Sequence, residues 1–228
     1  MKAEIEAIAK IHTDFSSKFG IPRQSGLVDE LEATIIFEEK YRNSEMLKGI
    51  EQFSHIWLLW QFSQCTDKSW TPTVRPPRLG GNKRMGVLAT RSPFRPNNIG
   101  LSSVKLLKVE KTEKYGTVLK VSGADLLDST PIFDIKPYIP YVDSHEDAVN
   151  GFALAQKEGT LKVDFPEELI NILPENKRKA AVAVLAQDPR PSYQDDPERI
   201  YGIEFVGFDI RFKVKDENLK VVEIEKLR

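Results

Sequence analysis

The sequence predicts a mainly β protein with some helix: an antiparallel sheet or barrel in the N-terminal part, followed by a smaller part of mixed helix and strand. The first observation is a series of short segments before residue 141 that are rich in branched and aromatic side chains and bounded by turn residues. The second is a change of composition after Tyr141, where a polar stretch precedes two helix-like segments. The third is a strict alternation of apolar and charged residues from Phe208 to Lys215.

Six segments of the N-terminal part have the composition of strands. Residues 53–62 are apolar on both parities, which is typical of a central strand covered on both faces. Long irregular loops at residues 13–29 and 66–84 interrupt the series, and such loops in a compact domain are usually functional or disordered. The expected strands are residues 3–11, 33–37, 53–62, 85–89, 103–109 and 117–121.

The C-terminal part begins near residues 143–147. Helices are expected at residues 166–172 and 174–187, each with proline in its first turn, where proline is tolerated. The alternating segment then turns at residues 216–218 into a second strand, which predicts a hairpin with one face in water. We therefore expect two domains, residues 1–144 and residues 145–228.

Composition excludes several classes of protein. Lysine and arginine number 33 against 34 acidic residues, so the net charge of -1 predicts that any nucleic-acid surface is local. The sequence contains no apolar run near the roughly 20 residues that cross a bilayer, and its first residues do not resemble a secretory signal. These features predict a cytoplasmic protein without a membrane segment.

The residues that bind metals or form disulfides are sparse. Cys65 is the single cysteine, which excludes an intrachain disulfide and a thiolate-clustered zinc site. His12, His55 and His145 are far apart in sequence, so we expect structural or surface histidines and no metal site. The chain also lacks a Gly-x-Ser-x-Gly motif, a P-loop and a Gly-x-Gly-x-x-Gly motif.

Positive charge is concentrated in one stretch of the chain. Residues 68–109 contain no Asp or Glu. A stretch of fixed positive charge without internal counter-ions attracts phosphates or a carboxylate. Its nine cationic residues are Lys68, Arg75, Arg78, Lys83, Arg84, Arg91, Arg95, Lys105 and Lys108.

Within this stretch, residues 91–102 combine rigidity with charge. Pro93 and Pro96 fix backbone torsions around Arg91 and Arg95. Preorganised guanidinium groups lose little entropy when they bind a planar anion or stack on a base, which favours a recognition loop. The alternative is a proline-stiffened turn with solvated arginines.

A second unusual segment, residues 123–138, carries three carboxylates in a hydrophobic context. Asp125 or Asp128 is suited to cap a helical turn, and Asp134 is suited to pair with Lys136 on the same face of a strand. The functional alternative is a negative cluster that faces a cationic ligand or accepts hydrogen bonds from ribose hydroxyls and an amine. The residues alone leave both interpretations open.

Taken together, five motifs resemble the TrmO (TsaA-like) tRNA methyltransferase family. They occur in order along nearly the whole chain, and several motifs at fitting separations are more specific than any one of them. The motifs are Pro22-Arg23-Gln24-Ser25-Gly26-Leu27, residues 70–82, residues 91–102, residues 125–138 and Asp188-Pro189-Arg190-Pro191-Ser192-Tyr193.

This resemblance implies a fold and a reaction. The implied fold is an N-terminal antiparallel barrel that binds S-adenosylmethionine without a Rossmann domain, with a small C-terminal domain and active sites near a homodimer interface. The implied reaction is methyl transfer to the exocyclic nitrogen of threonylcarbamoyl-adenosine beside the anticodon, in a threonine tRNA. The cofactor contacts implied by similarity are Pro22, Arg23, Gln24, Ser63, Gln64, Arg91, Leu101, Asp125, Leu126, Leu127 and Asp128.

The acceptor nitrogen is bonded to a carbonyl and carries a proton, so a nearby proton acceptor should assist the reaction. The candidates are Asp125, Asp128 and Asp134, which the sequence does not rank.

A small-metabolite methyltransferase and a catalytically silent RNA-binding module are the two rival functions. The residues expected to contact the tRNA are Arg75, Arg78, Arg84, Arg95, Lys136 and Tyr193.

Overall fold

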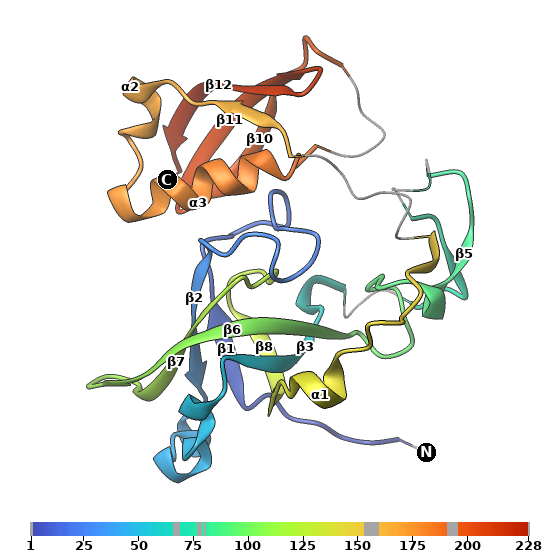
Figure 1. Ribbon diagram of the computed structural model, residues 1–228, viewed down its shortest axis with the longest axis vertical. Helices are drawn as coiled ribbons and strands as arrows, with labels where there is room; N and C mark the ends of the chain where they lie inside the picture. The colour runs from blue at the N-terminus through green and yellow to red at the C-terminus, as the bar shows by residue number, and fades with distance from the viewer. Residues whose placement is uncertain are drawn as a thin grey trace.

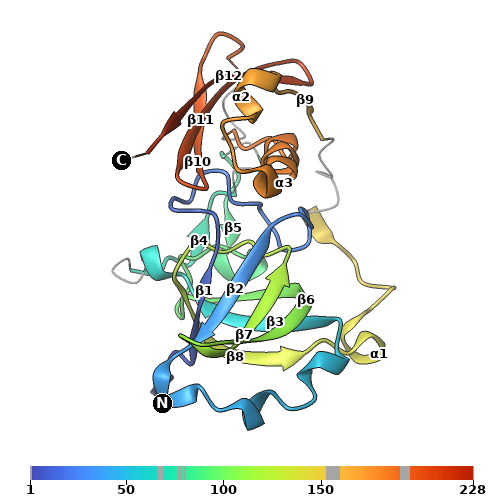
Figure 2. The same ribbon diagram turned by 90° about the vertical axis from the view of Figure 1, so that its left-hand side faces the viewer.

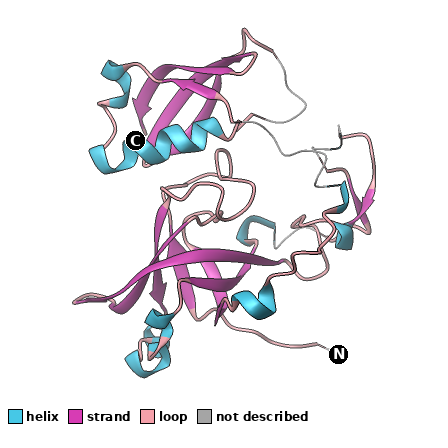
Figure 3. Cartoon of the chain, in the orientation of Figure 1, coloured by secondary structure: helices cyan, strands magenta, loops and turns pink. Residues whose placement is uncertain are grey.

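The computed structural model describes residues 2–65, 69–76, 79, 81–152, 160–190 and 196–227. In this part of the chain, a lower β body and an upper sheet with a covering helix are stacked along the long axis (Figure 1). The loop of residues 13–31 rises from the lower body towards the upper one (Figure 1). Most of the regular structure is strand (Figure 3), so the mainly β prediction is confirmed.

The lower body is a six-stranded antiparallel sheet that closes on itself in the order β1-β2-β7-β6-β3-β8 (Figure 2). Because every strand pairs with two neighbours, the closed barrel leaves no edge strand open to pairing with another chain. Its strands are β1 (Ala9–His12), β2 (Glu32–Phe37), β3 (His55–Gln61), β6 (Ile99–Thr112), β7 (Gly116–Ser122) and β8 (Thr130–Pro137).

Strand β3 is paired on both sides and is not an edge strand, as its sequence predicted. It pairs with β6 on one side and β8 on the other. Ile56, Leu58 and Trp60 point into the core, while Trp57 and Leu59 alternate with them and remain partly covered on the outer face.

Two expected strands are shorter than predicted. Strand β1 begins at Ala9 rather than at residue 3; Ala9 lies opposite Phe37, the last residue of β2, and opposite Ile132 on β8. Ile8 still hydrogen-bonds to Ile132 and to Glu38, but residues 2–7 belong to no strand. The segment at 85–89 forms only β5 (Met85–Gly86), which pairs with β4 (Thr73–Val74) away from the barrel, and a 3-10 helix (Val87–Ala89) follows.

The upper body is a four-stranded sheet in the order β10-β11-β12-β9, with α3 (Glu175–Ala186) packed on it. The predicted hairpin is confirmed as β11 (Phe208–Lys215) and β12 (Asn218–Lys226), and α3 matches the second expected helix. The first expected helix is the short α2 (Glu167–Ile170). The other elements of this region are β9 (Lys162–Asp164), β10 (Tyr201–Phe205) and, after the barrel, α1 (Pro140–Asp143).

Residues 13–31 join the two bodies. Phe15 is buried in the upper core, where its ring lies 5.5 Å from that of Phe205. Asp14 accepts a hydrogen bond from the Lys177 ammonium at 2.6 Å, and its backbone oxygen accepts one from the Val206 amide at 3.0 Å. The core of the upper body thus depends on a loop that precedes β2 in the chain.

Candidate functional site

Two glycines bring the loop of residues 22–26 against the β7–β8 loop. The Gly26 amide donates to the Gly123 carbonyl at 2.9 Å, and both residues have φ of +75°. A Cβ on Gly123 would lie 3.3 Å from the backbone N and Cα of Gly26. Glycine at these positions therefore permits both the left-handed turns and the close approach of the loops.

Asp125 lies where these loops meet. The Ser102 hydroxyl donates to its Oδ1 at 2.6 Å, and the backbone of Ser25 also hydrogen-bonds to the carboxylate. Burial raises the pKa of Asp125 above its ordinary value, while the hydrogen bond from Ser102 and the positive charge of Arg91 act in the opposite direction. The carboxyl is thus a partly buried acceptor near a guanidinium.

A chain of polar contacts leads from this carboxyl to the upper body. The Arg91 guanidinium donates to the Gln24 side-chain oxygen, and the Gln24 amide donates to the Arg23 carbonyl at 2.5 Å. The Arg23 guanidinium donates to the Arg190 carbonyl at 3.4 Å. Asp188, with φ of +50°, accepts two hydrogen bonds from the Arg190 guanidinium, at 2.8 and 2.9 Å. The structure therefore brings together residues from four of the five recognised motifs.

The loop of residues 91–98 is fixed beside the end of β3, where Ser63 and Gln64 form a 3-10 helix with Cys65. The Asn98 amide donates to the Pro93 carbonyl at 2.6 Å and to the Cys65 carbonyl at 3.4 Å. Arg95 donates to the Thr90 carbonyl at 3.0 Å. Part of the Arg95 guanidinium thus holds its own loop, in addition to any contact with substrate.

Three leucines from the implied cofactor set lie in different environments. Leu101 is 54% exposed and faces outward from β6, opposite to its buried neighbour Ser102. Leu126 is 1% exposed in the barrel core, so any ligand contact would run through its backbone. Leu127 is partly buried, and its carbonyl accepts from the Thr130 hydroxyl at 2.7 Å. Pro22 is buried as well.

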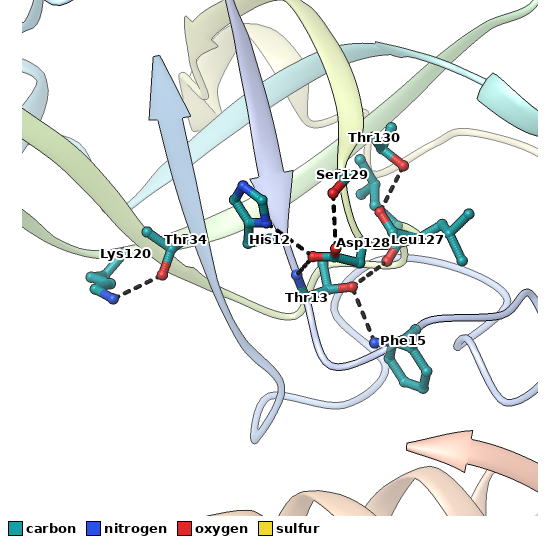
Figure 4. A network of polar contacts seen from close by, with 10 residues as sticks. His12, Thr13, Phe15, Thr34, Lys120, Leu127, Asp128, Ser129 and Thr130 are labelled. Carbon is teal, nitrogen blue, oxygen red and sulfur yellow. Dashed lines mark hydrogen bonds and ion pairs between the residues drawn. The ribbon is translucent and has the colours of Figure 1, made fainter. Parts of the chain in front are cut away.

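Asp128 lies at the junction of the two bodies (Figure 4). Its Oδ1 accepts the Thr13 amide at 3.0 Å and contacts His12 Nδ1 at 3.2 Å, while its Oδ2 accepts the Ser129 hydroxyl at 2.9 Å. The Asp128 amide donates to the Phe15 carbonyl at 2.9 Å. These contacts fix the start of the loop that enters the upper core.

Asp134 forms the same-face pair with Lys136 that the sequence allowed. The Lys136 ammonium lies 2.9 Å from Asp134 Oδ2 on β8, and the two side chains are 63% and 44% exposed. Asp134 Oδ1 accepts its neighbour's amide, that of Ile135, at 2.9 Å. The pair is on the outer wall of the barrel, because Asp134 lies opposite Leu59 in the register with β3.

The expected tRNA contacts lie in the β4–β5 region and beyond it. Arg75 and Arg84 flank the two short strands and are exposed, and the Arg84 guanidinium donates to the Thr73 hydroxyl at 2.8 Å. Arg78 and Tyr193 lie outside the described residues.

The sequence did not indicate two residues that the structure adds to this region. Ser102 and Trp60 connect the barrel core to Asp125, since Trp60 Nε1 donates to Ser102 Oγ at 3.0 Å. Ser102 ends a recognised motif and Trp60 lies in an expected strand, but neither pattern indicated their contact. The signal for it is a polar atom at an inward position of an apolar strand, where such an atom requires a partner. Asp188 and Arg190 belonged to a recognised motif but had no assigned contact.

In the part of the chain that the structure describes, no helix is long and apolar enough to span a membrane. Those same residues contain no group of three or more His, Cys, Asp or Glu side chains arranged to hold a metal ion.

Comparison with known proteins identifies the family. Residues 10–144 match the tRNA-methyltransferase O N-terminal domain, and residues 158–227 match the TrmO C-terminal domain. The chain is 40% identical over 230 residues to the tRNA (adenine(37)-N6)-methyltransferase of Escherichia coli K12, covering 97% of each protein. It is 40% identical over 220 residues to a putative S-adenosylmethionine-dependent methyltransferase, RcsF, of Pseudomonas aeruginosa, covering 93% of each.

The fold agrees with this match. The crystal structure of TrmO from Pseudomonas aeruginosa superposes with a TM-score of 0.79 at 33% identity, covering 99% of this chain and 100% of that one. Both family models and the full-length relative span the barrel and the upper body together. The chain therefore belongs to the TrmO family of S-adenosylmethionine-dependent tRNA methyltransferases.

Proposed function

We propose that this chain methylates the exocyclic nitrogen of threonylcarbamoyl-adenosine next to the anticodon, with threonine tRNA as its acceptor. The name of the Escherichia coli relative, a tRNA (adenine(37)-N6)-methyltransferase, supports the position and the atom. The observation that carries the proposal is the meeting of Gln24, Arg91 and the partly buried carboxyl of Asp125 at the end of the barrel.

The groups at this site fit S-adenosylmethionine. The cofactor carries a carboxylate, which requires a cation. It also carries an ammonium and ribose hydroxyls, which require hydrogen-bond acceptors. Arg23 and Arg91 offer guanidinium groups, while Gln24 and Asp125 offer amide and carboxylate oxygens. When bound, the cofactor supplies a methyl group already activated on a sulfonium sulfur. We assign binding to these four residues, with Pro22, Ser63, Gln64, Leu101, Leu126, Leu127 and Asp128 as the surrounding positions.

Among the three carboxylates, Asp125 is the best proton acceptor for the reaction. Asp134 is paired with Lys136, and Asp128 holds the start of the 13–31 loop. Asp125 is partly buried near Arg91, and a carboxylate with a raised pKa binds a proton more readily than an ordinary one. It thereby assists the weakly nucleophilic nitrogen when the new bond forms.

The remaining parts of the proposal concern the partners of the chain. Arg75, Arg78 and Arg84 bind tRNA phosphates, Arg95 and Lys136 contribute further positive charge, and Tyr193 stacks on a base. Residues 1–144 and 145–228 are the two domains, and the protein acts in the cytoplasm as a homodimer. The exposed Leu101 and Ile99 on the outer face of β6 favour a subunit interface there.

The test is transfer of a labelled methyl group from S-adenosylmethionine to purified threonine tRNA, with and without the threonylcarbamoyl group. We expect labelling of the modified tRNA alone, at the anticodon-adjacent adenosine. Equal labelling of the unmodified tRNA would contradict the assigned acceptor. Turnover without RNA would favour a metabolite methyltransferase, and RNA binding without transfer would favour a silent binding module.

A further inference from the structure

Two core residues on neighbouring strands connect the barrel interior to Asp125. Trp60 on β3 lies opposite Gly100 on β6, and Ser102 is two residues further along β6 on the same inward face. This is a diagonal cross-strand pair, within reach of a tryptophan side chain. Trp60 is 8% exposed and Ser102 is 1% exposed, so water competes little for their polar atoms.

Gly100 provides the space for this arrangement. A Cβ at Gly100 would lie 2.3 Å from Trp60 Cε2 and 2.4 Å from its Cζ2. The indole therefore lies directly over the glycine backbone, with its Nε1 3.0 Å from Ser102 Oγ. An aromatic contact with Phe62, at 4.3 Å between ring centroids, supports the indole from another direction.

The direction of these hydrogen bonds follows from their chemistry. An indole nitrogen only donates, so Ser102 Oγ accepts from Trp60. The hydroxyl proton of Ser102 then points at its other partner, Asp125 Oδ1, at 2.6 Å. Oδ1 is consequently held as the acceptor of the Ser102 hydroxyl.

We propose that Trp60 and Ser102 are positioning residues that orient the Asp125 carboxylate for proton uptake by holding its Oδ1 through the Ser102 hydroxyl. This inference rests on the proposed function for its catalytic consequence, since neither residue is assigned a contact with cofactor or tRNA. The backbone of Ser25 and the charge of Arg91 face the same carboxyl from the other loops. The orientation thus links the packed barrel core to the site formed by the loops.

The experiment compares the wild-type chain with Ser102→Ala, Trp60→Phe and Ser122→Ala. Ser122 is a matched control, because it is a serine on β7 that is only 3% exposed. Its neighbour Val121 lies in the barrel core, so the Ser122 side chain is on the other face of the strand. Two measurements are made on each variant. One is the pH profile of single-turnover methyl transfer to modified tRNA, and the other is a carboxyl-carbon NMR titration of Asp125, assigned by its loss in Asp125→Asn.

We expect Ser102→Ala to move the titration of Asp125 and the acidic limb of the rate profile to higher pH, because the charged carboxylate loses a donor. A misoriented acceptor should also lower the single-turnover rate about tenfold to a hundredfold. Trp60→Phe should move the Asp125 titration and the acidic limb to higher pH as well, but by less than Ser102→Ala does. Ser102 keeps its hydroxyl in this variant but loses the hydrogen bond that fixes its orientation. Ser122→Ala should match the wild type in both.

Each other outcome contradicts a defined part of the inference. An unchanged Asp125 titration in Ser102→Ala would overturn the role of Ser102, and an unchanged one in Trp60→Phe would overturn that of Trp60. If Ser102→Ala does not fold, Trp60→Phe carries the test. If the wild type transfers no methyl group to tRNA, the proposed function fails, whereas the NMR titration still decides whether the carboxyl is oriented by the core.

Discussion

Asp125 and Asp128 lie three residues apart in one loop, yet they serve different parts of the molecule. Asp125 is partly buried, accepts a hydrogen bond from a hydroxyl of the barrel core and lies near Arg91, and burial raises its pKa. Asp128 has a side chain 38% exposed and binds the backbone of Thr13 at the junction with the upper body (Figure 4). The difference shows that two carboxylates with the same sequence context acquire their chemistry from the groups around them.

The largest expected effect separates the two positions by activity. Asp125→Asn removes the proton acceptor but keeps an oxygen for the Ser102 hydroxyl, so methyl transfer should fall about a hundredfold or more. Asp128→Asn should keep transfer within about threefold of wild type, because other contacts also hold the 13–31 loop. Single-turnover rates with saturating cofactor and modified tRNA measure both. A similar loss in the two variants would erase the distinction.

The second effect separates the positions by stability. Asp128→Ala leaves the Thr13 amide without its side-chain acceptor, which should lower the free energy of unfolding by about 1–3 kcal/mol. Loss of anchoring at residues 13–15 should be felt in both bodies, because Phe15 is buried in the upper core. Urea unfolding followed by tryptophan fluorescence measures the change. An unfolding free energy equal to that of the wild type would show that the contacts of Asp128, including those with His12 and Ser129, do not stabilise the fold.

The third effect tests the charge that faces Asp125. Arg91→Gln removes a guanidinium that binds Gln24, so the affinity for S-adenosylmethionine should fall about tenfold, the size expected for a hydrogen bond to a charged group. Arg95→Gln is the matched variant in the same loop, and it should leave cofactor affinity nearly unchanged. Calorimetric titration measures both. Equal weakening would mean that loop rigidity, rather than the Arg91 charge, supports the site.

Sequence patterns predicted the elements more successfully than the contacts between them. The apolar pattern of β3 and the alternation of β11 identified these strands because each pattern is local to one segment. The start of β1 at Ala9 was not predictable, since it depends on where its partner strand β2 ends, at Phe37. Likewise, Phe15 precedes β2 in the chain but packs against Phe205, nearly the full length of the chain away.

The candidate site shows the same limit. The motifs around Gln24, Arg91 and Asp125 indicated a shared site, and the structure places these residues together. The motifs could not rank the three carboxylates as proton acceptors. The carboxylates differ in burial and in hydrogen-bond partners, and these two properties arise from tertiary structure. Ser102 lies within a recognised motif, but its contact with Trp60 follows from the β3–β6 register alone.

A smaller effect compares the stability of the two positions across pH. Because burial raises the pKa of Asp125 in the folded chain, its ionised form costs stability at neutral pH. This cost is present above the folded-state pKa and disappears as pH falls through it towards the ordinary value of an aspartate. Asp125→Asn should therefore raise the melting temperature at pH 7.5, with a gain that shrinks at acidic pH. A melting temperature below that of the wild type at pH 7.5 would mean that the Arg91 charge outweighs the burial of the carboxyl.

The smallest expected effect separates the site from the basic β4–β5 region. If Arg75 and Arg84 each neutralise one phosphate, the double variant Arg75→Gln/Arg84→Gln should reduce the log-log salt slope of tRNA binding by about 1.4–1.8. The acidic limb of the methyl-transfer profile should stay in place, because this limb belongs to Asp125. A charge-matched control is Lys215→Gln/Lys226→Gln at exposed ends of β11 and β12, which should keep the wild-type slope. An equal reduction in the control would assign the salt dependence to the overall charge of the chain, whereas a change confined to the first variant would locate the phosphate contacts at the β4–β5 region.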